Sequence, residues 1–237
     1  MEALCQRAEA YYNREGIPFV TVTYAQSLDG SIAGLNGEPV AISCDESLVY
    51  THALRACHDG IMVGIETVLS DNPSLSTRLV AGSSPRPIVL DSMLRMPHNA
   101  KLLAADNPVR PVIFTTDNSA PAQQEALRAK KACVKVLQAN AQGWLALDDV
   151  LQALGEMGIK SLMVEGGGKV ITSFIQSQAV DHLIVTLSMK MIGGRTVLNP
   201  QQMHNGLRGA LPMELSLSEV HWEGNDIILH GDPVWEM

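Results

Sequence analysis

The sequence has few cysteines, and they lie far apart along the chain. Cys5, Cys44, Cys57 and Cys133 are the only four among 237 residues, and no two of them form a CxxC pair. This spacing excludes a disulfide-dense secreted scaffold and favours reduced thiols inside a cell. The seven histidines form neither HExxH nor the HxE…PCxxC pattern of zinc deaminases. We therefore expect no structural or catalytic metal.

Long apolar runs and an excess of basic residues are also missing. No hydrophobic stretch approaches the roughly 20 residues that a membrane-spanning helix needs. The first residues, MEALCQRAEAYYNREG, lack the cationic start and apolar centre of a secretory signal. The formal net charge is −8, which argues against nucleic acid or an anionic membrane as the main partner. We expect a cytoplasmic protein without a membrane or nucleic-acid partner.

Length and patterning fit one α/β domain. With 46% hydrophobic and 18% charged residues, a chain of 237 residues is able to bury a substantial core. Strand-like and helix-like segments alternate, and two alternating segments around Gly224-Asn225 predict a final hairpin. This order predicts a mainly parallel central sheet flanked by helices, with a C-terminal antiparallel hairpin.

Individual elements follow from local patterns. Helices are expected over 2–15, 45–58, 123–131 and 147–157, and strands over 19–24, 59–64, 88–90, 111–115, 133–137 and 181–189. The segment ETVLSDNPSLSTR, residues 66–78, is expected to be a loop broken at Asn-Pro.

Residues 159–174, IKSLMVEGGGKVITSF, read as a strand, a glycine turn and the start of a helix. Glu165 falls at the end of the strand, and three glycines follow it. Glycines there let backbone N–H groups approach a ligand, and the helix start behind them offers unpaired donors to a phosphate. The pattern is neither GxGxxG nor a Walker loop. A plain turn that needs positive φ explains it equally well, although a carboxylate at the carboxyl end of a strand favours a ligand site.

Four segments together resemble the reductase family of riboflavin biosynthesis. They are PFVTVTYAQSLDG (18–30), LRACHDGIMVGIETVLSDNPSL (54–75), RPIVLDS (86–92) and KSLMVEGGGKVI (160–171). The resemblance implies a dihydrofolate-reductase-like fold, with residues 1–17 as an N-terminal helical extension and 18–237 as a single reductase domain. The first segment is most similar to the stand-alone fungal branch, whose members reduce 2,5-diamino-6-(ribosylamino)-4(3H)-pyrimidinone 5′-phosphate with NADPH.

The resemblance also implies site residues. Those expected to contact NADPH are Ala25, Thr67, Asp71, Gly166, Gly167, Gly168, Lys169 and Val170. Those expected to contact the phosphorylated pyrimidine are Thr23, Arg55, Leu75, Arg78 and Glu165. The two arginines are expected on the ribose phosphate, and Glu165 is expected to accept hydrogen bonds from ring amino groups. Glu165 is the one residue given a catalytic role, because it orients the ring for hydride transfer from NADPH.

Several of these residues have simpler explanations when each is taken alone. Arg55 and Arg78 fit solvated or ion-paired side chains, whereas Thr67 and Asp71 fit a helix cap and a turn residue. Asp29, before Gly30, fits a turn former. Lys169 and Arg195 are the candidates for binding the 2′-phosphate of NADPH.

Three further expectations depend on the resemblance. Thr23 stands where the bacterial branch commonly has a lysine, which favours the diamino pyrimidine over the deaminated 5-amino-6-(5-phosphoribosylamino)uracil. A dihydrofolate-type reductase of another pterin or pyrimidine, and a non-catalytic NADPH-binding regulatory protein, remain open alternatives. The family also implies a homodimer, to which the alternating strand at 181–189 is a candidate contributor.

Overall fold

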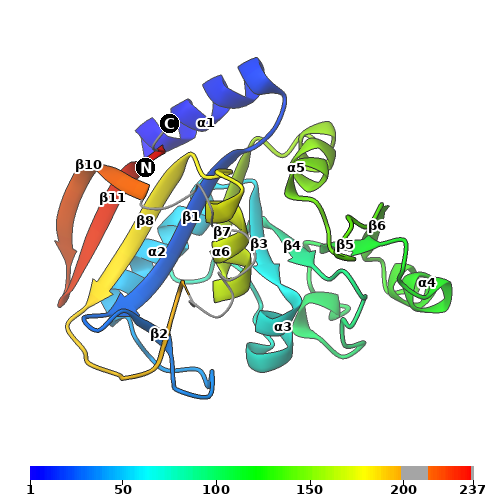
Figure 1. Ribbon diagram of the computed structural model, residues 1–237, viewed down its shortest axis with the longest axis horizontal. Helices are drawn as coiled ribbons and strands as arrows, with labels where there is room; N and C mark the ends of the chain where they lie inside the picture. The colour runs from blue at the N-terminus through cyan, green and yellow to red at the C-terminus, as the bar shows by residue number, and fades with distance from the viewer. Residues whose placement is uncertain (199–212, 236–237) are drawn as a thin grey trace.

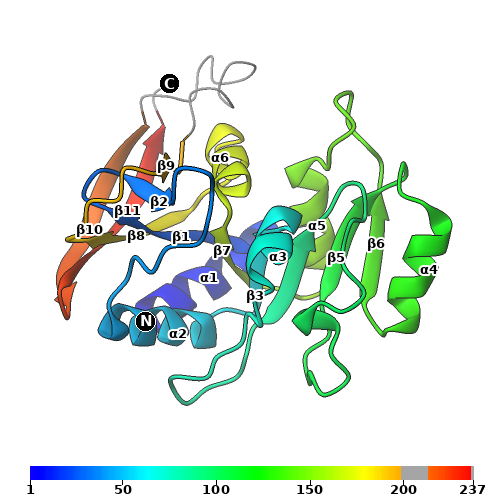
Figure 2. The same ribbon diagram turned by 90° about the horizontal axis from the view of Figure 1, so that it is seen from below.

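A parallel sheet forms the centre of the computed structural model, which describes residues 1–198 and 213–235 (Figures 1 and 2). The nine-stranded sheet has the order β10-β11-β8-β1-β7-β3-β4-β5-β6. All neighbours from β8 to β6 are parallel, whereas β11 is antiparallel to β8 and β10 to β11. The predicted fold, a mainly parallel sheet ending in an antiparallel hairpin, is confirmed.

The strands are short at the centre and long at the hairpin. They are β1 (Phe19–Ser27), β3 (Gly60–Gly64), β4 (Arg86–Leu90), β5 (Val112–Thr116), β6 (Cys133–Leu137), β7 (Ser161–Gly166), β8 (His182–Ser188), β10 (Met213–Glu223) and β11 (Asp226–Trp235). A second, two-stranded sheet pairs β2 (Ser31–Ala33) with β9 (Arg195–Thr196). These two strands were not predicted, because segments of two or three residues carry no readable periodicity.

Helices cover both faces of the large sheet (Figure 2). They are α1 (Glu2–Glu15), α2 (Asp45–Cys57), α3 (Ile65–Asp71), α4 (Pro121–Ala129), α5 (Leu147–Glu156) and α6 (Gly168–Gln176), with a 3-10 turn η1 (Lys101–Leu103). The expected N-terminal helix is confirmed. It ends at Gly16, whose left-handed backbone (φ 73°) lets its N–H donate to the Tyr12 carbonyl. Among the described helices, none is both long and apolar enough to cross a bilayer.

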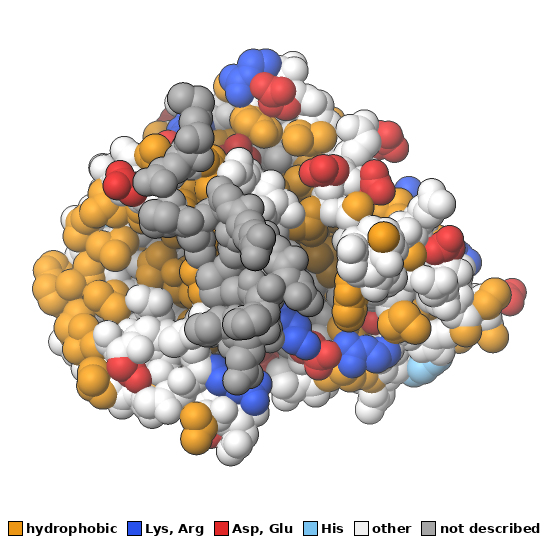
Figure 3. All heavy atoms as spheres, viewed as in Figure 1, with side chains coloured by type: hydrophobic (Ala, Val, Ile, Leu, Met, Phe, Trp, Pro, Cys, Tyr) orange, Lys and Arg blue, Asp and Glu red, His pale blue; other side chains and the backbone are white. Residues whose placement is uncertain are grey.

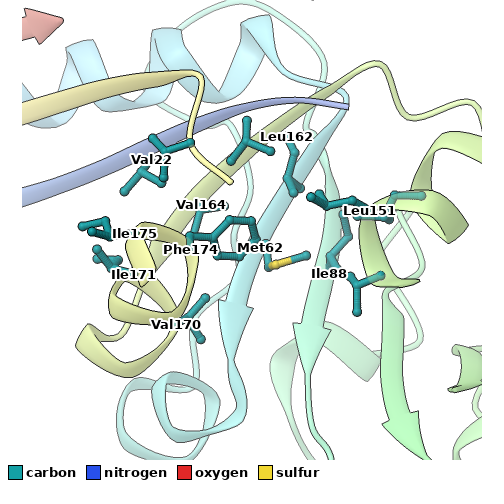
Figure 4. Close-up of a cluster of buried hydrophobic side chains, with 14 of the residues drawn as sticks. Val22, Met62, Ile88, Leu151, Leu162, Val164, Val170, Ile171, Phe174 and Ile175 are labelled. Carbon is teal, nitrogen blue, oxygen red and sulfur yellow. The ribbon is translucent and has the colours of Figure 1, made fainter. Parts of the chain in front are cut away.

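Alternation along the strands divides the core into two layers. Val20, Val22 and Val164 point toward α5 and α6, where Phe174 of α6 is fully buried (Figure 4). Phe19 and Met163 point to the other face, where α1 and α2 pack with residues such as Leu4 and Leu54. The N-terminal helix is therefore packed on the sheet through its own buried face.

The prediction of a loop over 66–78 is wrong for residues 66–71. A helix, α3, begins directly after β3 and continues to Asp71. Ile65 and Val68 are buried, so tertiary packing holds a segment that is too short for a clear helical pattern. Asn72 takes the left-handed conformation (φ 43°) just before Pro73, so the Asn-Pro pair ends this helix. Several strands also extend further than expected, among them β1 to Ser27, β4 back to Arg86 and β7 to Gly166.

A buried histidine beneath α2 makes stability depend on pH. His58 Nδ1 lies 2.7 Å from the Leu54 carbonyl oxygen, and its Nε2 lies 2.9 Å from Thr21 Oγ1. The neutral ring satisfies both contacts, with Nδ1–H donating and Nε2 accepting the Thr21 hydroxyl. Burial lowers the pKa of His58 below its usual value. The unfolded chain therefore binds this proton more readily than the folded protein does.

The free energy of unfolding is expected to fall as the pH is lowered through the usual histidine range. The contribution of His58 is complete above its unfolded pKa and is lost toward acid, at no more than about 1.4 kcal/mol per pH unit. Urea unfolding at several values between about pH 7.5 and 5.5 measures this dependence. The free energy of unfolding of His58→Asn is expected to change less steeply with pH than that of the parent. His98→Asn, at an exposed histidine, serves as the control. Equal slopes in all three proteins would contradict the prediction.

Candidate functional site

The carboxyl ends of β1, β7 and β3 meet at one edge of the sheet, the edge at which parallel α/β sheets bind ligands. β7 lies between the other two strands and carries a bulge. Val164 pairs with Met62 and Gly166 pairs with Val63, which leaves Glu165 as an extra residue. Bulges of this kind re-aim a side chain. The sheet thus presents the predicted carboxylate at its ligand-binding edge, on the face covered by α2.

Glu165 is held by Arg55 of α2. Arg55 Nε and NH2 each donate to one Glu165 carboxylate oxygen at 2.6 Å, and the two side chains are only 13% and 15% exposed. Burial lowers the pKa of the guanidinium, but the hydrogen bonds and charge of Glu165 outweigh that effect and raise it overall. The two hydrogen bonds therefore fix the orientation of both side chains.

The pairing of Arg55 with Glu165 bears on the ligand-binding roles predicted for both residues. Arg55 was expected on a phosphate and Glu165 on a pyrimidine ring, whereas here each is the other's partner. A guanidinium has five N–H donors and a carboxylate about four acceptor positions. Arg55 uses two donors on Glu165 and one on the Ser76 carbonyl at 3.2 Å. Both groups therefore keep capacity for a ligand, and both predicted roles stay predictions.

The segment after α3 brings the second arginine to the same place. The Arg78 backbone N–H donates to His52 Nδ1 of α2 at 3.0 Å, and the Arg78 side chain is exposed. Leu75 is 2% exposed and anchors the segment with φ 51°. Burial, followed by the charges of Arg55 and Arg78, lowers the pKa of His52, which keeps its ring neutral as an acceptor. Sequence reasoning missed His52, because nothing in its local pattern shows that it supports Arg78.

The predicted residues of β1 lie one strand away from Glu165. Thr23 pairs with Ile184 of β8 and is 6% exposed, and Ala25 follows it on the same face with partial exposure. Thr21, earlier on this face, contacts His58 beneath α2. Thr23 and Ala25 therefore line the face of the sheet that also carries Glu165.

The glycine turn lies directly beyond Glu165 and requires its glycines. Gly166 has φ 137°, and Gly167 has φ 51° with ψ 144°, conformations that other residues rarely adopt. A Cβ on Gly167 would lie 3.0 Å from Thr67 Oγ1, and one on Gly168 would lie 3.1 Å from the Val197 carbonyl oxygen. The turn is thus packed between α3 and the segment after β9, and it brings together Thr67 and Gly167, two of the residues expected to contact NADPH.

The start of α6 keeps open donors at this turn. Gly167 is its N-cap residue, and no side chain among the described residues caps the helix. First-turn N–H groups of a helix lack partners within the helix and favour anions. Lys169 is exposed in this first turn, and Val170 packs so close to Gly64 that a Cβ there would lie 2.7 Å from it. The predicted phosphate site has the required donors, and its occupancy by NADPH stays a prediction.

Lys169 and Arg195, the two candidates for binding a 2′-phosphate, lie in different surroundings. Near the start of α3, Arg95 Nη2 donates to Glu66 Oε1 at 2.7 Å, whereas Asp71 is exposed at the end of that helix. Arg95 is the larger cause, and Lys169 a smaller one, of the lowered pKa of Glu66, so both cations lie near it. Arg195 instead donates its Nε to the Leu35 carbonyl at 3.1 Å. Arg95, which sequence reasoning missed, therefore joins Lys169 as a candidate.

Asp29 holds the turn after β1 to the segment after β8. Its carboxylate accepts the backbone N–H groups of Ile192 at 3.0 Å and Gly193 at 2.6 Å. Hydrogen bonds from Ser27, and then from these backbone groups, lower the pKa of Asp29. The position is therefore a structural anchor. A separate hollow of about 380 Å³, lined by residues that include His98, Arg110 and Lys130, contains none of the predicted site residues.

Comparisons with known proteins show the family to which the chain belongs. Residues 18–229 match the family model described as the RibD C-terminal domain. The 2,5-diamino-6-ribosylamino-4(3H)-pyrimidinone 5′-phosphate reductase of Debaryomyces hansenii is 38% identical over 203 residues, covering 80% of this chain and 82% of that protein. The riboflavin biosynthesis protein RibD of Actinobacillus pleuropneumoniae is 32% identical over 220 residues, covering 92% of this chain and 58% of that protein.

Solved structures lead to the same family. Acinetobacter baumannii RibD superposes with a TM-score of 0.78 at 25% identity, covering 96% of this chain and 61% of that one. The riboflavin biosynthesis reductase Rib7 of Saccharomyces cerevisiae gives 0.71 at 28% identity, covering 96% and 98%. The chain therefore spans about three fifths of these bacterial RibD chains but nearly the whole fungal reductase. The family expected from four sequence segments is confirmed, and the chain belongs to the RibD C-terminal domain family.

Proposed function

We propose that this protein reduces the ribosyl group of 2,5-diamino-6-(ribosylamino)-4(3H)-pyrimidinone 5′-phosphate to the ribitylamino form, with NADPH as the reductant. The observation that carries the proposal is the continuity of β7 and α6. A partly buried carboxylate, Glu165, is followed at once by the glycine turn and the uncapped start of α6. A carboxylate suited to binding a pyrimidine ring is thus followed directly by backbone N–H groups suited to binding a pyrophosphate. The names of the fungal relatives support this substrate class.

NADPH supplies the hydride, and the residues of the chain position the reactants. The open donors at Gly167 and Gly168 hold the pyrophosphate, while Thr67 contacts the cofactor beside the turn. The ribosylamine opens to a Schiff base, whose C1′ accepts the hydride while its imine nitrogen takes a proton from solvent. Glu165 fixes the pyrimidine so that the two carbons lie within about 3–3.5 Å of each other. Free thiols at all four cysteines fit the cytoplasmic location expected for such chemistry.

The diamino pyrimidine is expected to be the better substrate of the two known forms. Thr23 is buried and uncharged, so the ring edge above it meets no fixed cation. Glu165 accepts an amino group, whereas the carbonyl of the deaminated ring offers it no hydrogen. Purified protein is expected to oxidise NADPH at least about 10-fold faster, in kcat/KM, with the diamino compound. Turnover of the deaminated compound alone would reverse the choice, and NADPH binding without turnover of either would favour a regulatory protein.

We also propose that the protein is a homodimer formed through the hairpin. β10 is the edge strand of the sheet, and Leu217, Val220, Trp222 and Val234 of the hairpin are between 48% and 62% exposed. Hydrophobic atoms gather over this end of the molecule in Figure 3. An edge strand of 11 residues with an exposed apolar face is an open pairing surface unless another chain covers it. A second copy presents the same surface and closes it by two-fold symmetry.

Trp222→Glu is expected to convert the dimer into a monomer. A charge in the centre of an apolar interface loses the buried area of the indole and places two like charges near the symmetry axis. Light scattering coupled to gel filtration measures the mass, with Trp144→Glu as the matched control because Trp144 is 61% exposed but lies far from the hairpin. A parent protein that is monomeric at micromolar concentration would refute this interface.

A further inference from the structure

A polar cluster lies on the face of the hairpin opposite to Trp222. Glu219 and His221 are two residues apart on β10, so their side chains share a face. Glu219 pairs across the hairpin with His230 of β11. One ligand atom from each of these three residues lies within 4.8 Å of the other two. The antiparallel register thus brings two imidazoles and one carboxylate to a single point on the α2 side of the sheet.

His221 has a nitrogen without a hydrogen bond. Its Nδ1 is buried and has no hydrogen-bond partner among the residues that the structure describes. Glu219 Oε1 lies only 3.1 Å from that nitrogen, at an angle that makes no hydrogen bond. Two ligands of a tetrahedral zinc ion, each about 2.0–2.1 Å from the metal, lie about 3.3 Å apart. The spacing of these two atoms is therefore that of ligands that share a cation.

His230 is held in the form that binds metals. Asp232 Oδ1 lies 2.7 Å from His182 Nδ1, and His182 Nε2 lies 3.2 Å from His230 Nδ1. Because a carboxylate only accepts, His182 carries its proton on Nδ1 and accepts the Nδ1–H of His230 through Nε2. His230 Nε2 is then left with a lone pair, which accepts the Tyr50 hydroxyl at 2.7 Å. A carboxylate–histidine chain of this type orients metal-ligating histidines.

We propose that Glu219, His221 and His230 form a zinc site that ties β10 to β11 beneath α2. Two histidines and a glutamate are an established zinc ligand set, and the borderline softness of imidazole favours a transition ion over Mg²⁺ or Ca²⁺. Glu219 is 62% exposed, so water reaches the fourth position from solvent. The second nitrogen of the His221 ring, Nε2, lies 3.6 Å from Glu223 Oε1.

This site departs from the expectation of no metal. The expectation came from contiguous motifs such as HExxH, in which a helix presents the ligands at fixed spacing. Here a hairpin presents them, and Glu219 and His230 become neighbours only through strand pairing. The site is also independent of the proposed reaction, because its ligands are on the outer strands of the sheet, away from Glu165 and the glycine turn.

The test is zinc binding by the full chain without an affinity tag, after treatment with a chelator. Calorimetry is expected to show one Zn²⁺ per chain, and Co²⁺ is expected to give the visible absorption of a tetrahedral site. Saturating Zn²⁺ is expected to raise Tm by about 5 °C. Glu219→Gln and His221→Asn are each expected to weaken binding at least about 10-fold. A melting temperature equal to that of the parent without metal shows that each variant is folded.

Two further variants separate this site from others. Tyr50→Phe removes the hydroxyl that competes for His230 Nε2, so it is expected to keep or increase zinc affinity. His98→Asn, at an exposed histidine elsewhere, is expected to leave binding unchanged. Cys5 and Cys57, whose sulfurs lie 2.9 Å apart, are another place where zinc could bind. Loss of binding in Cys57→Ser but not in Glu219→Gln, or the absence of any stoichiometric binding, would overturn the proposal.

Discussion

Glu165→Gln is expected to lower kcat/KM for the NADPH-dependent reduction by about 10²–10³-fold, because an amide cannot replace the carboxylate at both of its partners. One oxygen becomes an NH2 group, which places a donor against a donor either at Arg55 or at a ring amino group. Arg55 then keeps a charge that is only partly paired, at a position where its side chain is 13% exposed. The dissociation constant of NADPH is expected to stay unchanged, because the contacts proposed for the cofactor lie on the turn beyond Glu165.

Glu9→Gln is the matched control for this substitution. Glu9 also pairs with a cation, Lys160, but both side chains are largely exposed, at 62% and 44%. Exposed pairs contribute little, so this variant is expected to keep its activity and stability. If Glu165→Gln oxidised NADPH with the substrate as fast as the parent does, the role of Glu165 in ring recognition would be wrong.

A double substitution tests whether Arg55 orients Glu165, binds the ribose phosphate of the substrate, or does both. If Arg55 mainly orients Glu165, then Arg55→Met combined with Glu165→Gln is expected to be no worse than the more damaging single variant. If Arg55 also binds the ribose phosphate, the two losses are expected to multiply, and Arg55→Met alone is expected to raise KM for the substrate. The parent geometry, with one N–H on Ser76 and two on Glu165, permits both outcomes.

The sequence predicted the elements of the site well where chemistry and local pattern coincide. Glu165 and the glycines after it were found because a strand, a carboxylate and a flexible turn are contiguous in the chain. The helix over 65–71 was missed because two buried residues, Ile65 and Val68, hold it, and a segment this short carries no helical period. Burial of a single turn against a sheet is a property of the fold, which a local pattern does not contain.

Contacts between residues that are far apart in the chain could not be predicted from the sequence, for the same reason. Arg55 and Glu165 are 110 positions apart, and each was given its own ligand before the structure showed them bound together. Which strands become neighbours decides such pairs, and β7 lies between β1 and β3 although β4, β5 and β6 precede it in the chain. His52 beneath Arg78 and the pair of Glu219 with His230 became visible only through the same topology.

Gly167→Val is expected to raise the dissociation constant of NADPH by about 10²-fold. Its backbone, at φ 51° and ψ 144°, lies outside the regions open to a β-branched residue, so the turn must either store strain or change shape. The first atom of the new side chain would lie 3.0 Å from Thr67 Oγ1, against the hydroxyl predicted to contact the cofactor. Either response moves the N–H groups at the start of α6 away from the pyrophosphate.

Gly143→Val is the control for Gly167→Val, because it introduces backbone strain at a glycine far from the proposed cofactor site. Gly143 has φ 80°, and a Cβ there meets nothing within 4 Å, so the substitution has a comparable backbone cost in open surroundings. It is expected to lower the free energy of unfolding by about 1–3 kcal/mol and to leave NADPH affinity unchanged. Fluorescence titration with NADPH measures both variants. Equal affinities in the parent and in Gly167→Val would mean that the cofactor does not lie across this turn, because no bound pyrophosphate tolerates a branched side chain between itself and the backbone donors.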